Sequence, residues 1–330
     1  MVLEHQVRRD RDVTDLALPA DAWLDWLCAE YLDGFVREGG AAIKVAVVPS
    51  PETSAALAER LLTEAGGRGF AVARVDAATC KAHLLHNLFH EVARQLDWEG
   101  LTRDFVRRLL LDAGWALPGD GALEVAAVAR ANEQDATIVR QDVRLALTRH
   151  LMHDRGLSRQ FRLGALSMCR ALTEPDELRV ELAAHVRMWL RGELPRVSSL
   201  RDAFIHQKVD RHTARTMILS TAAFVRHAGR EGLVTTVDVS RYALARPVDD
   251  GRNRYSKAAA LDMWETLRQF IDGADDLGGG LFVFLVGAEF VADDARGMRG
   301  YNALNFRLTD DVRDRRRPNP LAPMVRIAAC

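Results

Sequence analysis

Residues 43–65 have the sequence IKVAVVPSPETSAALAERLLTEA, and this stretch decides the fold of the chain. Its first six residues are apolar enough to predict a strand buried on both faces, and residues 53–65 repeat apolar side chains at helical spacing. Because a strand followed by a helix is the repeating unit of α/β proteins, the stretch predicts a parallel sheet covered by helices on both faces. Four further apolar runs predict the remaining strands, at 70–75, 233–238, 281–286 and 324–328.

Apolar residues repeat at helical spacing through much of the rest of the chain. Those that alternate with the strands lie, beyond 53–65, at 81–96, 211–227, 256–271 and 301–308. The middle of the chain predicts helices only, at 101–113, 122–132, 137–150, 158–172 and 175–190. We therefore expect residues 1–100 and 196–330 to form the two halves of one α/β domain, with an α-helical insertion at 101–195.

Composition excludes several classes of protein. The chain has 330 residues, of which 48% are hydrophobic and 28% charged, which suits a folded domain with a sizeable core. Its 45 Lys and Arg nearly balance 46 Asp and Glu, so net charge gives no argument for a nucleic-acid or membrane partner. The four cysteines are scattered and the first residues are charged, so we expect reduced thiols, no signal peptide, no membrane span and a cytoplasmic protein.

The connection after the first strand lies where a nucleotide-binding α/β protein carries its phosphate loop. Such a loop needs glycines, a lysine that reaches the phosphates and a hydroxyl that holds Mg²⁺. Here the corresponding residues include no glycine, and two prolines remove N–H donors. The chain has only four lysines, and none lies in this connection. The candidate nucleotide-binding residues that remain are Pro49, Ser50, Glu52, Thr53 and Ser54.

The third predicted strand ends in Asp238 followed by Val239. An acid at the end of this strand holds Mg²⁺ in nucleotide hydrolases, and a glutamate after it polarises the attacking water. Asp238 has the required residue type, whereas Val239 cannot act as a base. Alternatively, Asp238 only caps a neighbouring turn.

Several segments, taken in order, resemble one protein family. They are 22–24 with 35–40, 68–76, 222–229 with 232–234, 285–290 and 296–304. This order of segments is similar to that of the BREX-type ATP-binding domain family (BrxC/BrxD-like), AAA+-like P-loop proteins of bacterial phage-defence islands. The resemblance implies an AAA+-like P-loop NTPase fold with a five-stranded parallel sheet. It also implies ATP with Mg²⁺ as the ligand of an intact member.

This sequence departs from the family pattern at three places. Family members carry a GxxGxGKS loop and an Asp-Glu pair, where this chain has residues 49–54 and Asp238-Val239. At the sensor position a small polar residue is replaced by Ala288. These departures indicate degenerate Walker A and Walker B motifs, no catalytic residue and no cofactor.

Two other groups of residues are candidates for function. His83, His86 and His90 fall on one face of the predicted helix 81–96, so they suit either a metal site or a polar helix face. Arg307, with Arg299 nearby, suits either an arginine finger towards a partner's nucleotide or a surface salt bridge to Asp310 or Asp311. The arginine-rich segment 313–317 suits a phosphate backbone or a solvated loop.

The sequence therefore leaves three functional hypotheses. The first is a pseudo-ATPase that serves as a structural or regulatory subunit of an anti-phage or DNA-processing complex. Its partner would be another P-loop ATPase or defence-system protein, in a homo- or hetero-oligomer, with direct DNA contact left open. The second is a weak ATP-binding protein that completes a composite ATPase site, and the third is a histidine-dependent metal enzyme.

Overall fold

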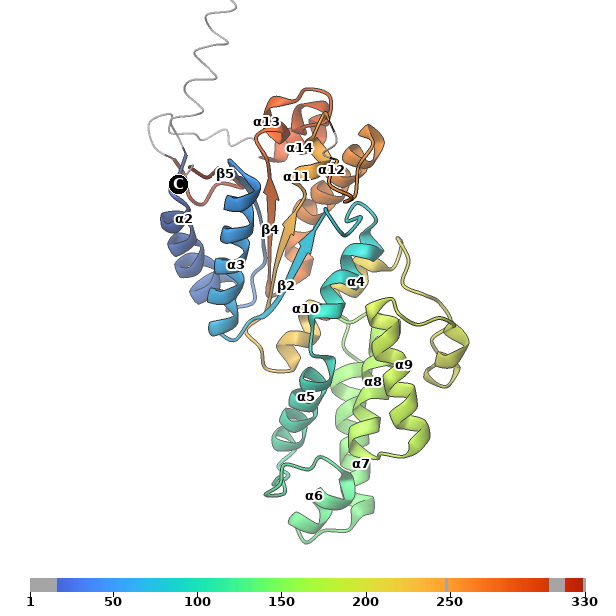
Figure 1. The fold of residues 1–330 in the computed structure, drawn as a ribbon. Coiled ribbons are helices and arrows are strands. Elements are labelled where there is room, and N and C mark those ends of the chain that lie inside the picture. The colour runs from blue at the N-terminus through green and yellow to red at the C-terminus, as the bar shows by residue number, and fades with distance from the viewer. Residues whose placement is uncertain (1–16, 247–248, 309–317, 329–330) are drawn as a thin grey trace, which may run out of the picture. The chain divides into compact units, whose positions relative to one another are not determined.

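The computed structural model describes residues 17–246, 249–308 and 318–328 (Figure 1). The chain divides into two compact units, residues 1–88 with 231–330, and residues 89–230. The region 101–195, expected as a helical insertion, lies within the second unit.

The first unit is built on a five-stranded sheet in which all pairings are parallel. The strand order is β2-β3-β4-β1-β5, so that β4 separates β1 from β3. The predicted α/β fold with a five-stranded parallel sheet is confirmed, and each predicted strand overlaps an observed one. The strands are β1 (Ala42–Val47), β2 (Ala71–Asp76), β3 (Leu233–Asp238), β4 (Gly280–Val286) and β5 (Met324–Arg326).

Helices cover both faces of this sheet (Figure 1). On one face Val283 of β4 belongs to a buried cluster with Trp23 and Leu57, which come from α2 (Ala20–Leu27) and α3 (Pro51–Gly67). Neighbouring residues of β4 point to the other face, where Phe282 contacts Phe270 with ring centroids 5.1 Å apart. The whole of β4 is buried, as expected for a central strand of a parallel sheet.

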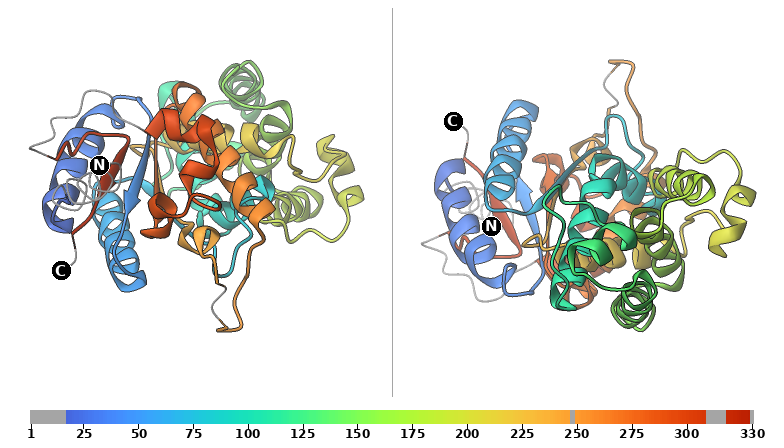
Figure 2. Two further views of the ribbon diagram at one scale, coloured as in Figure 1. Left: turned by 90° about the horizontal axis from the view of Figure 1, so that it is seen from above. Right: turned by 90° about the horizontal axis from the view of Figure 1, so that it is seen from below.

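The remaining elements of this unit are short, except for α12, which carries Phe270. Leu18, just before α2, forms a parallel bridge with Ile327, just after β5. In Figure 2 the dark blue helices near the start of the chain accordingly lie beside the dark red strand β5. These elements are the π-helix η1 (Cys28–Phe35), α11 (Ser240–Ala243), α12 (Lys257–Asp272), η4 (Ala274–Leu277), α13 (Glu289–Ala292), η5 (Met298–Gly300) and α14 (Asn302–Leu308).

Residues 89–230 are all described and contain no strand, as the sequence predicted for most of this region. Trp98 packs against Phe161, and Phe161 against Phe224, so one aromatic cluster joins helices far apart in sequence. The helices are α5 (Trp98–Asp112), α6 (Val125–Ala131), α7 (Ala136–Leu147), the π-helix η2 (Thr148–Met152), α8 (Arg159–Thr173), α9 (Glu177–Arg191), the 3₁₀-helix η3 (Val197–Ala203) and α10 (Ala214–His227); α4 (Leu85–Gln95) precedes them.

Two predicted helices begin later than expected. The helix predicted from 81 begins at Leu85, and the one predicted from 211 begins at Ala214. In the second case the Asp210 carboxylate accepts hydrogen bonds from the backbone N–H groups of His212 and Thr213, at 2.9 and 3.0 Å. Asp side chains favour such turns over helix, which explains the later start. No helix in the described part of the chain is both long and apolar enough to cross a membrane.

Candidate functional site

The candidate site lies at the carboxyl edge of the sheet, where β1 leads into α3 and β3 ends. Here the Ser54 hydroxyl donates a hydrogen bond to Oδ2 of Asp238 over 2.5 Å. Ser54 stands in the first turn of α3 and is only 1% exposed, whereas Asp238 is the last residue of β3. The fold therefore brings together two candidate residues that are 184 positions apart in the sequence.

The other oxygen of the Asp238 carboxylate is also engaged. Its Oδ1 accepts hydrogen bonds from the Ser240 backbone N–H at 3.0 Å and from the Ser240 hydroxyl at 2.7 Å. Ser240 was not a candidate from sequence, although an Asp two residues before a Ser is a local signal for such a turn. Val239 is buried and donates its N–H to the Leu285 carbonyl. Its apolar side chain cannot act as the base of a hydrolytic site.

The connection between β1 and α3 is short. β1 ends at Val47 and α3 begins at Pro51, which leaves three residues between them. Ser50 is the N-cap of α3: its hydroxyl accepts from the Thr53 N–H at 3.2 Å and lies 3.2 Å from the Thr53 hydroxyl. Three residues, one of them the exposed Pro49, do not form a loop that could surround a phosphate.

The first turn of α3 has also lost the N–H donors that bind anions at helix N-termini. Pro51 has no N–H group, and Ser50 occupies that of Thr53. Its own backbone N–H and the nearby Ser50 hydroxyl lower the pKa of the exposed Glu52 carboxyl, so this side chain is a carboxylate at neutral pH. A negative charge therefore sits at this helix N-terminus. The residues present do not fit ATP or its magnesium ion, because they provide neither a set of free N–H donors nor a lysine for the phosphates.

The lysine of this region has a different role. Lys44, in β1, is 5% exposed and donates from Nζ to the carbonyl oxygens of Leu321 at 2.6 Å and Ala322 at 3.3 Å. Its Nζ also lies 4.6 Å from the centre of the Tyr31 ring. Burial lowers the pKa of Lys44 from 10.5 to about 8. Lys44 therefore ties the segment before β5 to β1 through hydrogen bonds to backbone carbonyl groups of this chain.

The arginine-finger candidate is already paired. Arg307, in α14, donates from Nη2 to Oδ2 of Asp272 at 2.8 Å and also contacts Asp272 through Nε. The ion pair described for Arg307 is made to Asp272 of α12, whereas the partners expected from sequence, Asp310 and Asp311, lie outside the described residues. The candidate arginines at 313–317 lie outside them as well. Nη1 of Arg299 lies 3.4 Å from Oδ1 of Asp294. Ala288, the sensor candidate, is the exposed N-cap of α13.

The predicted histidine face is wrong. His83 precedes α4, because the helix begins only at Leu85, so the three rings do not share one helix. Nδ1 of His83 lies 2.9 Å from the Tyr242 hydroxyl, and Nδ1 of His90 lies 2.9 Å from the Leu190 carbonyl oxygen. Nδ1 of His86 is buried without a partner. Across the described ranges, no three His, Cys, Asp or Glu side chains are grouped to hold a metal ion, so the metal-enzyme hypothesis gains no support.

Comparison with protein families decides the relationship of the chain. Residues 55–329 match the family described as BREX system ATP-binding protein BrxC/D. The chain belongs to this family. No curated protein and no solved structure is similar enough to the chain to count as a match. The matched region begins one residue after Ser54, so the β1–α3 connection lies outside it, while Asp238 lies within it. Membership of a BREX system implies partners within a defence complex.

Proposed function

We propose that this BrxC/D-family chain is a pseudo-ATPase, which serves its BREX defence complex as a structural or regulatory subunit. The β1–α3 connection carries the proposal. It has three residues and is followed by a helix turn in which Pro51 has no N–H group, Ser50 occupies the N–H of Thr53, and the Glu52 carboxylate adds a negative charge. Phosphate binding at a helix N-terminus depends on free N–H donors and the absence of nearby negative charge.

The residues that remain at the edge of the sheet serve stability in this proposal. Asp238 accepts hydrogen bonds from Ser54 and from both donors of Ser240, so its carboxylate joins α3, β3 and α11. Hydrogen bonds to a charged group are stronger than those between neutral groups, which suits a structural tie. A scaffold that keeps this tie can still present its surfaces to a partner ATPase after nucleotide binding has been lost.

A second candidate function has one observation in its favour. The Ser54 hydroxyl and the Asp238 carboxylate are in direct contact, and a hydroxyl beside a carboxylate is the pair that P-loop proteins use for Mg²⁺. In this alternative the chain binds ATP weakly and completes a composite site with a partner. The pairing of Arg307 with Asp272 argues against a finger role for Arg307 in that site.

Titration calorimetry with ATP and Mg²⁺ separates the two candidates. The pseudo-ATPase proposal predicts no ATP binding at the sheet edge, and therefore no difference in ATP binding between the wild type and Asp238→Ala. A ligand at 100 times its dissociation constant would stabilise the protein by about 2.7 kcal/mol, so thermal unfolding gives an independent readout. ATP binding that is lost in Asp238→Ala and in Ser54→Ala contradicts the proposal and supports the weak-binding alternative.

The regulatory role requires a partner, so it is tested by reconstitution. The chain is co-expressed with the intact P-loop ATPase of its own BREX system, and the ATPase rate of the partner is measured with and without it. We expect a stable complex and a changed rate that is insensitive to Asp238→Asn, which keeps the fold while altering the degenerate site. A partner ATPase that neither co-purifies with the chain nor changes its rate speaks against the role.

A further inference from the structure

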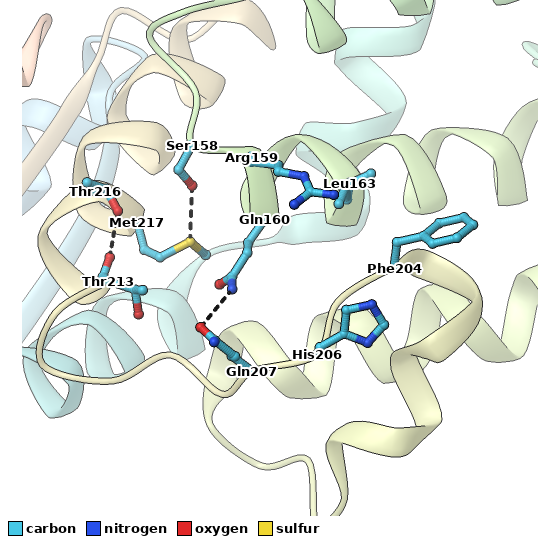
Figure 3. A pocket seen from close by; sticks show the side chains of 10 residues that line it. All are labelled: Ser158, Arg159, Gln160, Leu163, Phe204, His206, Gln207, Thr213, Thr216 and Met217. Carbon is cyan, nitrogen blue, oxygen red and sulfur yellow. Dashed lines mark hydrogen bonds between the residues drawn. The ribbon is translucent and has the colours of Figure 1, made fainter.

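A pocket of about 380 Å³ lies in the helical unit, within the size range of small-ligand sites. Three elements form it (Figure 3): the first turns of α8, the segment after η3, and the start of α10. No acidic side chain lines it, and residues 89–230 carry 22 Lys and Arg against 18 Asp and Glu. The lining residues are Ser158, Arg159, Gln160, Leu163, Phe204, His206, Gln207, Thr213, Thr216 and Met217.

The α8 side of the pocket offers donors for an anion. Arg159 and Gln160 are the first two residues of this 15-residue helix, and their backbone N–H groups make no hydrogen bond within the described structure. The Arg159 guanidinium is exposed and has no ion-pair partner in the described structure either. Free N–H groups at a helix N-terminus, next to an unpaired guanidinium, suit a phosphate group.

The same side of the pocket also holds a buried acceptor. Oε1 of Gln160 is shielded from solvent and has no hydrogen-bond partner, while its Nε2 lies 3.5 Å from Oε1 of Gln207. Figure 3 shows the Gln160 side chain extending from α8 towards Gln207. An unpaired buried carbonyl oxygen costs free energy, so a turn of the Gln160 amide towards the pocket would be favoured by a ligand that brings an N–H donor, such as the exocyclic amine of a nucleobase.

The opposite side of the pocket presents an aromatic ring. Phe204 is 67% exposed and has φ +56°, a left-handed conformation that costs a phenylalanine energy. His206 follows two residues later and is also exposed. The left-handed φ belongs to the C-cap of η3, and it leaves the ring exposed at the pocket, where an aromatic ring stacks on the π-face of any base.

We propose that this pocket binds a nucleotide unit, that is, a nucleobase joined to a phosphate. The base stacks on Phe204 and donates to Gln160, and the phosphate binds Arg159 and the N-terminus of α8. The unit is either a free nucleotide or one residue of a single strand, since both have this chemistry. The inference is independent of the pseudo-ATPase proposal, because it concerns residues 158–217 alone.

The first experiment compares AMP with its two parts by titration calorimetry on the full chain. We expect AMP to bind at least about tenfold more tightly than adenosine or ribose 5-phosphate, because stacking and phosphate contacts both contribute. If AMP does not bind at millimolar concentration, or binds no better than ribose 5-phosphate, the proposal is overturned.

Substitutions then assign the binding to this pocket. Phe204→Gly removes the ring, and glycine adopts the positive φ without strain, so the fold is retained. We expect about tenfold weaker AMP binding in Phe204→Gly and in Arg159→Gln, consistent with one stacking or one phosphate contact. Arg170→Gln is the matched control, because Arg170 is exposed in the last turn of α8, away from the lining. Wild-type affinity in both pocket variants overturns the proposal.

A single-stranded oligodeoxyadenylate of eight residues identifies the source of the nucleotide. If the oligonucleotide displaces AMP, and if Phe204→Gly weakens both ligands, the pocket accepts one residue of a strand. If the oligonucleotide leaves AMP bound, the pocket is a site for free nucleotides. ATP binding that Phe204→Gly weakens and Asp238→Ala leaves intact belongs to this pocket, and the reverse pattern belongs to the sheet edge, so the two proposals fail separately.

Discussion

The N-termini of α3 and α8 are two helix starts with opposite properties. At α3 Pro51 has no N–H group, the N–H of Thr53 is bonded to Ser50, and the negative charge of Glu52 lies beside them. At α8 the N–H groups of Arg159 and Gln160 make no bond, and the start of the helix opens into a pocket. The difference shows that the position of a motif in a fold and the availability of its donors are separate properties.

The two helices follow different kinds of connection. α3 follows strand β1 after three residues, the last of which, Ser50, caps the helix by accepting from the Thr53 N–H. Ser158 also caps α8, accepting from the Phe161 N–H at 3.4 Å, but this leaves the first two donors open. Both caps bind the N–H group three residues after the cap, so the difference lies in the first two helical residues. These are Pro51, which has no N–H, and the acidic Glu52 at α3, but Arg159 and Gln160 at α8.

The largest expected effect tests whether the two units are energetically separate. Trp98 is fully buried in the helical unit, and its indole N–H donates to the Ala93 carbonyl oxygen at 2.7 Å. Trp98→Ala should lower the stability of this unit by about 3–5 kcal/mol through the cavity it leaves. Hydrogen exchange should become faster in residues 89–230 and stay unchanged in the sheet.

Leu61→Ala is the matched change in the sheet unit, because Leu61 is fully buried between α3 and the sheet. It should speed exchange in β1 and β4 and leave the helical unit protected, with a cost of about 2–5 kcal/mol. Equal loss of protection in both units after either change would show one cooperative unit instead.

The next effect measures the tie between Asp238 and Ser54. Asp238→Ala removes three hydrogen bonds and leaves the buried Ser54 hydroxyl without its carboxylate partner. We expect a loss of about 2–4 kcal/mol in urea unfolding, since each charged hydrogen bond contributes and an unpaired buried group costs more. A double-mutant cycle with Ser54→Ala should give a coupling energy above about 0.5 kcal/mol, and additive effects would disprove the tie.

A pH titration tests the structural role of Lys44. Below pH 8 this lysine is protonated in both states, while between pH 8 and 10.5 the folded protein has lost a proton that the unfolded chain keeps. The free energy of unfolding should therefore rise over this interval, by about 3 kcal/mol. Measured in urea, the rise should be absent from Lys44→Met. An equal rise in wild type and variant would assign it to other groups.

The smallest effect compares the two caps directly. Ser50→Ala and Ser158→Ala each remove an N-cap hydroxyl, so each should cost about 1 kcal/mol in thermal unfolding. Ser50→Ala frees the Thr53 N–H but leaves Glu52 and Pro51 in place, so it should not create ATP binding. Measurable ATP affinity in Ser50→Ala would remove the contrast between the two helix starts.

Much of the fold was predictable because buried parallel strands are apolar along their whole length. The strand predicted at 43–48 is observed at Ala42–Val47, and that predicted at 233–238 is observed with these bounds. The π-helix η1 was not predicted, since its hydrogen-bond pattern has no simple sequence signal. The prediction that three histidines share one helix face was wrong because the residues just before Leu85 form turns, and apolar spacing alone did not distinguish these turns from helix.

The candidate site was predictable only in part. Asp238 and Ser54 were found because each follows a strand whose carboxyl end must lie at the same edge of a parallel sheet. The partner of Arg307 was not predicted, because Asp272 is 35 residues away on another helix. The pocket at Phe204 and Arg159 was missed entirely, because its residues come from three segments with no common spacing.

The sequence by itself determined the order of strands and helices, the family and the absence of a phosphate-loop glycine or lysine. These are local properties, since they depend on residue type, spacing and turn chemistry. Only the tertiary structure decided that both oxygens of the Asp238 carboxylate accept hydrogen bonds, that Lys44 donates to carbonyl groups of this chain, and that α8 begins at an open pocket. Hydrogen-bond saturation and burial depend on groups brought together from distant parts of the chain, so no local pattern records them.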